Sequence, residues 1–275
     1  MAYGDRQSSK DIDMSSLGGG SISGACATTT YLYFLHYVNA RNKVIRCYNA
    51  STRAAVTTRD TSLAWLLPHG LVAVGSTIWV LDAWTNYARA YTEPGTAGAL
   101  TRDSTKDINL GLLSWGGCAT DGTTLWFINS GADQARGWTA SSRARDRTKD
   151  FVISSTGLTS SPEAFKGGTG DVTTLWFVND NAVSGGNIPS NLVDGSRRKF
   201  LSAWTASSRE KDPNKSIILN ASGIYGSCVY SNDTIWVGES QTETAVAYDA
   251  STATAPTGPA PTEPTADEYK VYIGR

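Results

Sequence analysis

One short motif occurs five times in this sequence, and the repeat constrains the fold more than any other feature. Each copy is an apolar-aromatic-apolar triplet, and in four copies the aromatic residue is Trp. The aromatic residues lie 46, 47, 50 and 60 residues apart, at Tyr33, Trp79, Trp126, Trp176 and Trp236. A period of about 40 to 50 residues is typical of proteins that repeat one supersecondary unit.

Three further landmarks accompany the triplets. A Gly-rich segment precedes each triplet, starting at Gly24, Gly70, Gly117, Gly167 and Gly226. A second aromatic residue follows each triplet, at Tyr48, Tyr91, Trp138, Trp204 and Tyr248. A charged segment then follows four of them, at residues 59–63, 102–108, 145–151 and 215–217. Four short strands per repeat are typical of a propeller blade, and the charged fourth strand would protect the outer edge of the sheet.

The start of the repeat array supplies the strand that its end lacks. Residues 6–12 match the charged fourth strand but have no blade before them, and the fifth repeat has no fourth strand after it. The sequence therefore predicts an all-β, five-bladed β-propeller over residues 1–253, closed by the N-terminal strand that completes the last blade. A Pro/Thr-rich linker over residues 254–267 and an attachment strand over residues 268–275 would form an extended C-terminal tail.

Composition excludes several functions. The net charge is −1 and no basic cluster is large enough for a nucleic-acid surface, so we expect no nucleic-acid partner. No segment approaches the roughly 20 apolar residues that span a bilayer, and the N-terminus lacks a secretory signal. We therefore expect the chain to stay in the cell that makes it or to leave inside a virus particle. Three cysteines, Cys26, Cys118 and Cys228, occupy equivalent core positions, and no metal-ligand spacing occurs, so we expect no metal and no cofactor.

The third and fourth repeats resemble a known repeat family. Residues 120–127, with the sequence TDGTTLWF, and residues 145–151, with RDRTKDF, are similar to a propeller repeat of bacterial surface and phage-associated proteins. The resemblance implies a scaffold used in binding or adhesion, without catalytic residues. The C-terminal segment resembles β-segments of phage tail and fibre proteins, which implies that Tyr269, Val271, Tyr272 and Ile273 bind a partner. The alternative is a terminal strand that merely lies against a neighbour.

A ligand site is expected at the loops that join the fourth strand to the next blade and the second strand to the third, because these loops share one face. The residues just before the Gly-rich segments include His69, Trp115, Phe165 and Tyr225. Such a ring of side chains could stack on the C–H faces of sugars. The alternative is that these rings pack between neighbouring blades. Trp84 and Tyr87, in a loop outside the repeat pattern, are also expected to contact a ligand.

An insertion after the second strand of the fourth repeat, residues 179–199, accounts for the longest interval. It ends in Arg197, Arg198 and Lys199, for which we expect a role in partner binding. Long loops in compact domains are usually functional or disordered. This loop would either shape the ligand site or contact a neighbouring subunit.

Enzymatic activity is not expected. The acidic residues predicted at the loop face, Asp82 and Glu239, belong to blades that are not adjacent, and His36 and His69 have no catalytic motif around them. The predicted function is that of a structural or binding propeller in a phage particle, as part of a tail, a fibre or a head decoration. It would contact a host-surface glycan or other virion proteins. The alternative is a stand-alone carbohydrate-binding lectin, either extracellular or cytoplasmic.

Overall fold

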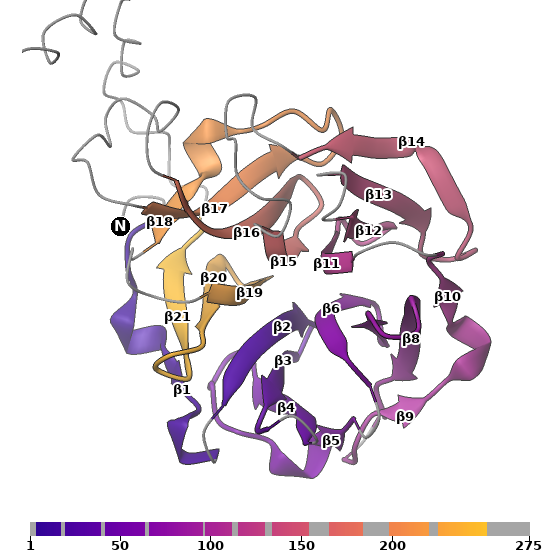
Figure 1. Ribbon diagram of the computed structural model, residues 1–275. Coiled ribbons are helices and arrows are strands. Elements are labelled where there is room, and N and C mark those ends of the chain that lie inside the picture. The colour runs from indigo at the N-terminus through magenta and orange to yellow at the C-terminus, as the bar shows by residue number, and fades with distance from the viewer. Residues whose placement is uncertain are drawn as a thin grey trace, which may run out of the picture.

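The chain folds into five antiparallel sheets arranged in a ring around a central axis (Figure 1). This computed structural model describes residues 4–17, 20–39, 42–63, 66–95, 97–111, 115–129, 134–153, 165–183, 198–219 and 225–251. The predicted five-bladed β-propeller is confirmed. Among the described residues, no helix has the length and apolar character needed to cross a bilayer.

In every blade the first strand lines the central channel and the last lies at the edge. Blade 1 contains β2 (Ser21–Ala27), β3 (Tyr31–Tyr37), β4 (Lys43–Asn49) and β5 (Thr61–Ser62). Blade 2 contains β6 (Pro68–Val74), β7 (Thr77–Asp82) and β8 (Tyr87–Thr92), with both β9 (Thr101–Arg102) and β10 (Ile108–Asn109) at its edge. Blade 3 contains β11 (Trp115–Thr120), β12 (Thr124–Asn129), β13 (Gln134–Thr139) and β14 (Arg145–Val152).

Blade 4 contains β15 (Phe165–Gly170), β16 (Thr174–Val183), β17 (Arg198–Thr205) and β18 (Ile217–Leu219). Blade 5 contains β19 (Tyr225–Ser231), β20 (Thr234–Glu239) and β21 (Thr244–Asp249), and its edge strand is β1 (Ile12–Asp13) from the other end of the chain. Ile12 pairs with Ala245 in antiparallel register. The N-terminal strand therefore closes the ring, as the sequence predicted.

The repeated Trp connects the second strand of a blade to its edge. The buried indole N–H donates to the backbone oxygen of a Lys in the edge segment, in the pairs Trp79–Lys106 (3.0 Å), Trp126–Lys149 (3.0 Å), Trp176–Lys215 (3.2 Å) and Trp236–Lys10 (2.9 Å). A buried Trp needs such a partner for its N–H group. The Trp and the Lys therefore recur together in the repeat because they are the donor and the acceptor of the same hydrogen bond.

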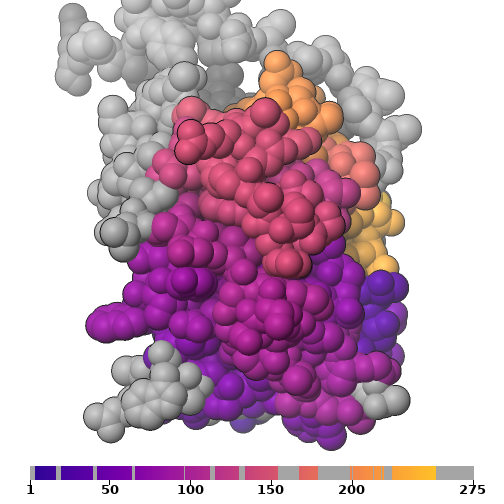
Figure 2. All heavy atoms as spheres, turned by 90° about the vertical axis from the view of Figure 1, so that its right-hand side faces the viewer, coloured from indigo at the N-terminus to yellow at the C-terminus, as the bar shows by residue number. Residues whose placement is uncertain are grey.

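The charged segment is continuous strand in blade 3, where β14 covers it, but in blade 2 it contains less strand than the sequence suggested. In blade 2 it consists of a 3₁₀ turn (Ser104–Lys106) followed by the two-residue strand β10. Asp107 forms an ion pair with Arg102 and also accepts a hydrogen bond from the backbone N–H of Ala90, at 2.9 Å. Equivalent contacts join Arg145 to Asp150 and Arg6 to Asp11. These outer segments form the edge of the ring, where those of blades 2 (magenta) and 3 (pink) lie next to each other (Figure 2).

The core consists of apolar layers between neighbouring blades. The inner strands approach one another so closely that side chains are excluded at some positions. A Cβ added to Gly226 would lie 2.1 Å from the backbone oxygen of Ile22, across the junction of blades 5 and 1. The Gly-rich first strands therefore allow five blades to close around a narrow channel.

Candidate functional site

Three of the four residues of the predicted aromatic ring, Trp115, Phe165 and Tyr225, occupy equivalent positions, and His69 does not. The pairing of each inner strand with its neighbour shifts by one residue just before the Gly-rich segment. In their own blades, Trp115 and Tyr225 occupy the pairing position that Pro68 occupies in blade 2. His69, the next residue, is the extra residue of the bulge in blade 2. Because side chains alternate along a strand, a shift of one residue points them to opposite sides.

Trp115 and Tyr225 are buried in the core, with 2% and 1% of their surface exposed. The Trp115 ring packs edge-on against Trp138, with centroids 5.9 Å apart. Their rings therefore do not face a ligand, and the expectation of an exposed ring is corrected at these two positions. The half-buried His69 has its Nδ1 atom 3.2 Å from the backbone oxygen of Trp115. Phe165 begins β15, but its side chain lies outside the described part of the structure.

Trp84 is the most exposed aromatic side chain that the structure describes on the predicted binding face, with 78% of its surface exposed. It lies in the turn between β7 and β8, as expected from the sequence. Leu67, whose backbone oxygen accepts a hydrogen bond from the N–H of Ala83 (3.0 Å), is also exposed, at 38%. Tyr87 follows the turn and is half-buried. We call Leu67, Trp84 and Tyr87 the Trp84 surface.

Asp82 holds the turn that carries Trp84. Its side chain is fully buried; Oδ1 accepts hydrogen bonds from the backbone N–H groups of Leu67 (3.2 Å) and Trp84 (3.3 Å). Its Oδ2 accepts from Thr85 Oγ1 (2.6 Å) and Arg89 Nε (2.9 Å). Burial alone would raise the pKa of Asp82, but the hydrogen bonds from Thr85 and Arg89 outweigh it and keep the pKa below its usual value. The turn is therefore rigid although Trp84 itself is exposed.

The residues predicted to bind a partner are mostly outside the described part of the chain. This applies to Arg197, to the side chain of Arg198 and to the whole tail with Tyr269, Val271, Tyr272 and Ile273. Lys199 is described and is only 9% exposed. Its Nζ atom lies 6.0 Å from the centroid of the Tyr225 ring, so Lys199 contacts its own chain.

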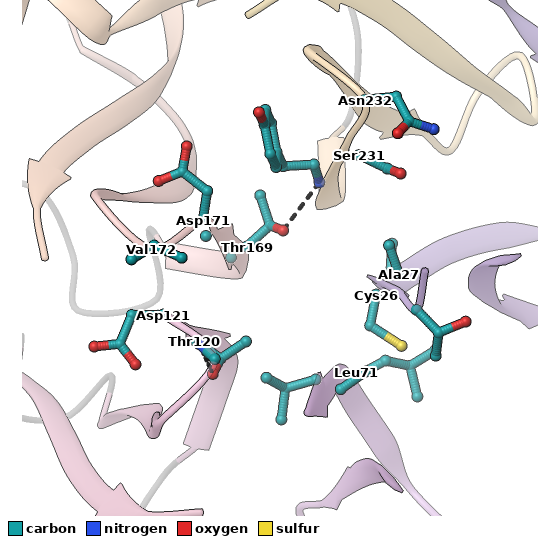
Figure 3. Close-up of a pocket in the computed structure, with 18 residues that line it drawn as sticks. Cys26, Ala27, Leu71, Thr120, Asp121, Thr169, Asp171, Val172, Ser231 and Asn232 are labelled. Atoms are coloured by element: carbon teal, nitrogen blue, oxygen red, sulfur yellow. Dashed lines mark hydrogen bonds between the residues drawn. The ribbon is translucent and has the colours of Figure 1, made fainter. Parts of the chain in front are cut away.

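A cavity of about 330 Å³ opens at the other end of the channel, where the first and second strands of the blades are joined. All five blades contribute to it (Figure 3), and we call it the channel-mouth cavity. Its wall contains small and apolar side chains, among them Ala25, Cys26 and Leu71, and Asp121 and Asp171 lie at its rim. Sequence reasoning considered only the opposite face. The one available signal was the repeated Asp-x-Thr-Thr sequence before two of the Trp triplets, which also fits an ordinary turn.

The four cysteines are free and buried. Burial raises the pKa of the Cys47 thiol to about 12, and it raises the pKa of Cys26 well above its usual value. Both thiols are therefore neutral at physiological pH. Among the described residues, no group of three or more His, Cys, Asp or Glu side chains is placed to hold a metal ion.

Comparisons with known proteins identify the fold but no family. No family model and no curated protein matches the sequence. Among solved structures, a glutaminyl cyclase from Myxococcus xanthus has a TM-score of 0.59 and 8% identity, over 87% of this chain and 94% of that one. A chain of a nidogen/laminin complex has a TM-score of 0.48 and 14% identity, over 84% and 77%. Raptor from Chaetomium thermophilum has a TM-score of 0.48 and 8% identity, over 93% and 30%.

These comparisons support the propeller architecture only. The likeness to the glutaminyl cyclase extends over nearly the whole of both chains, but at 8% identity it shows a shared fold and not a shared activity. The other two similarities are too weak to support any argument. Function must therefore be inferred from the residues of this chain.

Proposed function

We propose that this chain is a non-enzymatic binding propeller of a phage particle and that the Trp84 surface contacts its target. The observation that carries the proposal is the 78% exposure of Trp84 on a turn fixed by four hydrogen bonds to Asp82. An exposed Trp supplies a large contact area, and Trp is enriched among the residues that dominate binding energies. Because the turn is already ordered, binding loses little conformational entropy there.

The placement in a phage particle rests on the sequence. The repeats resemble those of phage-associated propellers, and the C-terminal segment resembles strands of tail and fibre proteins. We propose that the tail, through Tyr269, Val271, Tyr272 and Ile273, attaches the propeller to other virion proteins. Arg197 and Arg198 are proposed to add to that contact.

The absence of catalysis is part of the proposal. Both oxygens of Asp82 are engaged in holding the turn, and His36 is fully buried. Neither side chain is placed to act on a bound substrate. Because the glutaminyl cyclase has the same fold, the direct check is an assay for cyclisation of N-terminal glutamine in peptides. Turnover by the purified chain would contradict this part of the proposal.

A stand-alone carbohydrate-binding lectin is the second candidate. It is favoured by Trp84 as an exposed flat ring beside the half-buried Tyr87, because sugars stack on such rings and hydrogen-bond at their edges. The Trp84→Ala variant should lose binding to the target, whereas Val152→Ala, a change at another exposed apolar residue, should not.

Assembly of the free full-length chain with purified virion proteins separates the two candidates, because only a virion propeller is expected to assemble. Binding to a glycan array that depends on Trp84 would identify a glycan as the target of the Trp84 surface, which fits either candidate. If Trp84→Ala leaves every binding activity unchanged while the fold is intact, the Trp84 surface is not the contact site.

A further inference from the structure

His36 lies at the junction of blades 5 and 1, where the N-terminal segment closes the ring, and the function proposed above gives it no role. We propose that protonation of His36 opens the ring at this junction, so that the N-terminal segment leaves blade 5 in mild acid while the other junctions stay closed. The proposal rests on an imidazole without hydrogen bonds, on the contacts that cover it, and on the charges that surround it.

His36 occupies a repeat position at which the other blades have a side chain that accepts hydrogen bonds. It pairs with Ile22, the last residue before the strand shift, as Asp82 pairs with Pro68 in blade 2. The equivalent residues of blades 3, 4 and 5 are Asn129, Asn179 and Glu239. Asp82 holds its turn through four hydrogen bonds. Only the imidazole among these side chains gains a proton between pH 5 and 8 at its ordinary pKa.

The imidazole of His36 is completely buried and makes no hydrogen bond to any described residue. Both ring nitrogens, Nδ1 and Nε2, are without a partner there. Glu243 Oε2 is likewise buried and unpaired among the described residues, and it lies 3.8 Å from His36 Nε2, which is too far for a hydrogen bond. The folded chain therefore stabilises a proton on His36 through no hydrogen bond, and burying such a charge is costly.

Glu243 connects blade 5 to both segments that cover His36. Its backbone oxygen accepts a hydrogen bond from the N–H of Met14 (2.9 Å), and its Oε1 atom accepts one from the N–H of Gly20 (2.7 Å). We call these two contacts the Glu243 clasp. Gly20 lies against the imidazole, because a Cβ added to it would be 3.0 Å from His36 Nε2. Opening of the Glu243 clasp would therefore expose His36 to water.

The Glu243 clasp includes a strained backbone. Glu243 has a φ of +52°, in the left-handed region that residues other than glycine rarely adopt. Strain of this kind persists only while the surrounding contacts impose it. Once the clasp opens, the backbone of Glu243 can relax at the same time as His36 becomes hydrated. Both changes favour the open form.

Three charged groups face His36: Glu243 from blade 5, and Arg46 and Asp60 from blade 1. Burial has the largest effect and lowers the pKa of His36, the charge of Arg46 adds to it, and the two carboxylates do not compensate. In the open form the pKa returns to about 6.5, so the open form binds a proton more readily. The closed form is therefore fully favoured above about pH 7 and loses stability as the pH falls toward the lowered pKa.

The test is hydrogen–deuterium exchange of the full chain at pH 7.5 and pH 5.5, followed by NMR. Protection factors, which correct for the direct effect of pH on exchange, report the free energy of local opening. We expect the amides of Met14 and Gly20 to lose about five- to tenfold in protection at pH 5.5, because a pKa of about 6.5 in the open form limits the loss to about tenfold. The amides of Ala140 and Ala206, which donate to backbone oxygens in blades 3 and 4, should keep their protection.

This comparison uses the native chain and needs no variant. Loss of protection at Met14 and Gly20 alone supports opening at the junction of blades 5 and 1. Unchanged protection at these two amides would overturn the proposal. An equal loss at Ala140 and Ala206 would also overturn it, because the whole propeller would then be opening.

Two variants separate the imidazole from the carboxylate beside it. His36→Gln cannot gain a proton, so Met14 and Gly20 should be equally protected at both pH values. Glu243→Gln keeps an oxygen that can accept from Gly20 but cannot titrate, so it should still lose protection in acid. A loss that persists in folded His36→Gln, or that disappears in folded Glu243→Gln, would refute the proposal.

Discussion

Trp236 and Lys10 lie 226 positions apart in the chain, yet the indole N–H of Trp236 donates to the backbone oxygen of Lys10 over 2.9 Å. Lys10 returns the contact from its side chain, whose Nζ atom donates to Thr234 Oγ1 at 2.8 Å. The same pair of contacts is local in blade 4, between Trp176 or Thr174 and Lys215. In blade 5 it joins the two ends of the propeller.

Replacing Trp236 by Phe should therefore loosen the ring as well as the blade. The variant leaves a cavity and an unpaired carbonyl, and we expect a loss of about 2–4 kcal/mol in unfolding free energy, measured in urea. Trp126→Phe, which breaks the equivalent local contact with Lys149, should cost a similar amount. Only Trp236→Phe should make residues 4–13 sensitive to limited proteolysis. Equal protease resistance in both variants would contradict this closure.

The exposed Trp84 and the buried Asp82 should respond differently to mutation. Trp84→Ala should change the unfolding free energy by less than about 0.5 kcal/mol, because the side chain has few contacts to lose. Asp82→Ala removes four hydrogen bonds and leaves Arg89 without its ion pair, so it should cost about 2–4 kcal/mol. Thermal or urea unfolding measures both changes. A large stability loss in Trp84→Ala would mean that the ring is packed in solution.

The stability of the fold should fall on mild acidification because of His36. Burial, followed by the charge of Arg46, lowers the pKa of His36, and the opposing effects of Glu243 and Asp60 do not compensate. The unfolded chain, in which the pKa is about 6.5, then binds a proton more readily than the folded chain. Stability is therefore expected to decrease as the pH falls below about 7 and to recover when the pH is raised.

The check on His36 is the urea midpoint at pH 7.5 and at pH 5.5. His36→Gln should reduce the difference between the two midpoints. The Nε2 atom of His36 lies 3.8 Å from Glu243 Oε2, so a folded chain that gained stability in acid would instead indicate a favourable ion pair there.

Gly226 should tolerate no side chain. The Cβ of Ala at this position would lie 2.1 Å from the backbone oxygen of Ile22, and backbone atoms cannot move away without separating blades 5 and 1. We expect Gly226→Ala to cost more than about 3 kcal/mol or to prevent folding. Gly122→Ala is the control: its φ of +89° strains an Ala, but the space around it is open, so the cost should be about 1 kcal/mol. Soluble yield and urea unfolding would show the contrast.

The sequence was sufficient to predict the fold because the pattern of one blade occurs in it five times. The spacing of the repeated landmarks predicted where the four strands of each blade lie. The unmatched charged segment at residues 6–12 predicted how the ring of blades is closed. The reason for the Trp was not visible in the sequence, since its partner is the backbone oxygen of a Lys that is up to 226 positions away.

The site was harder to predict, and the errors have a physical origin. The alignment on the Gly-rich segments treated His69 and Trp115 as equivalent. Trp115 lies before the one-residue shift of its strand, whereas His69 is the extra residue within the shift of blade 2. The exposure of Trp84 could be predicted because this residue lies outside the repeat, where packing does not require an aromatic residue. The channel-mouth cavity was missed because Asp121 and Asp171, which lie at its rim, have the sequence of an ordinary turn.

The pairing of β1 with β21 also sets the order of events during synthesis. The ribosome makes residues 12–13 well before their partner strand at Thr244–Asp249. Until then the N-terminal segment has no sheet to join, and the ring remains open. A nascent chain that stops before β21 would therefore expose the apolar junction between blades 5 and 1, a form that chaperones and proteases recognise.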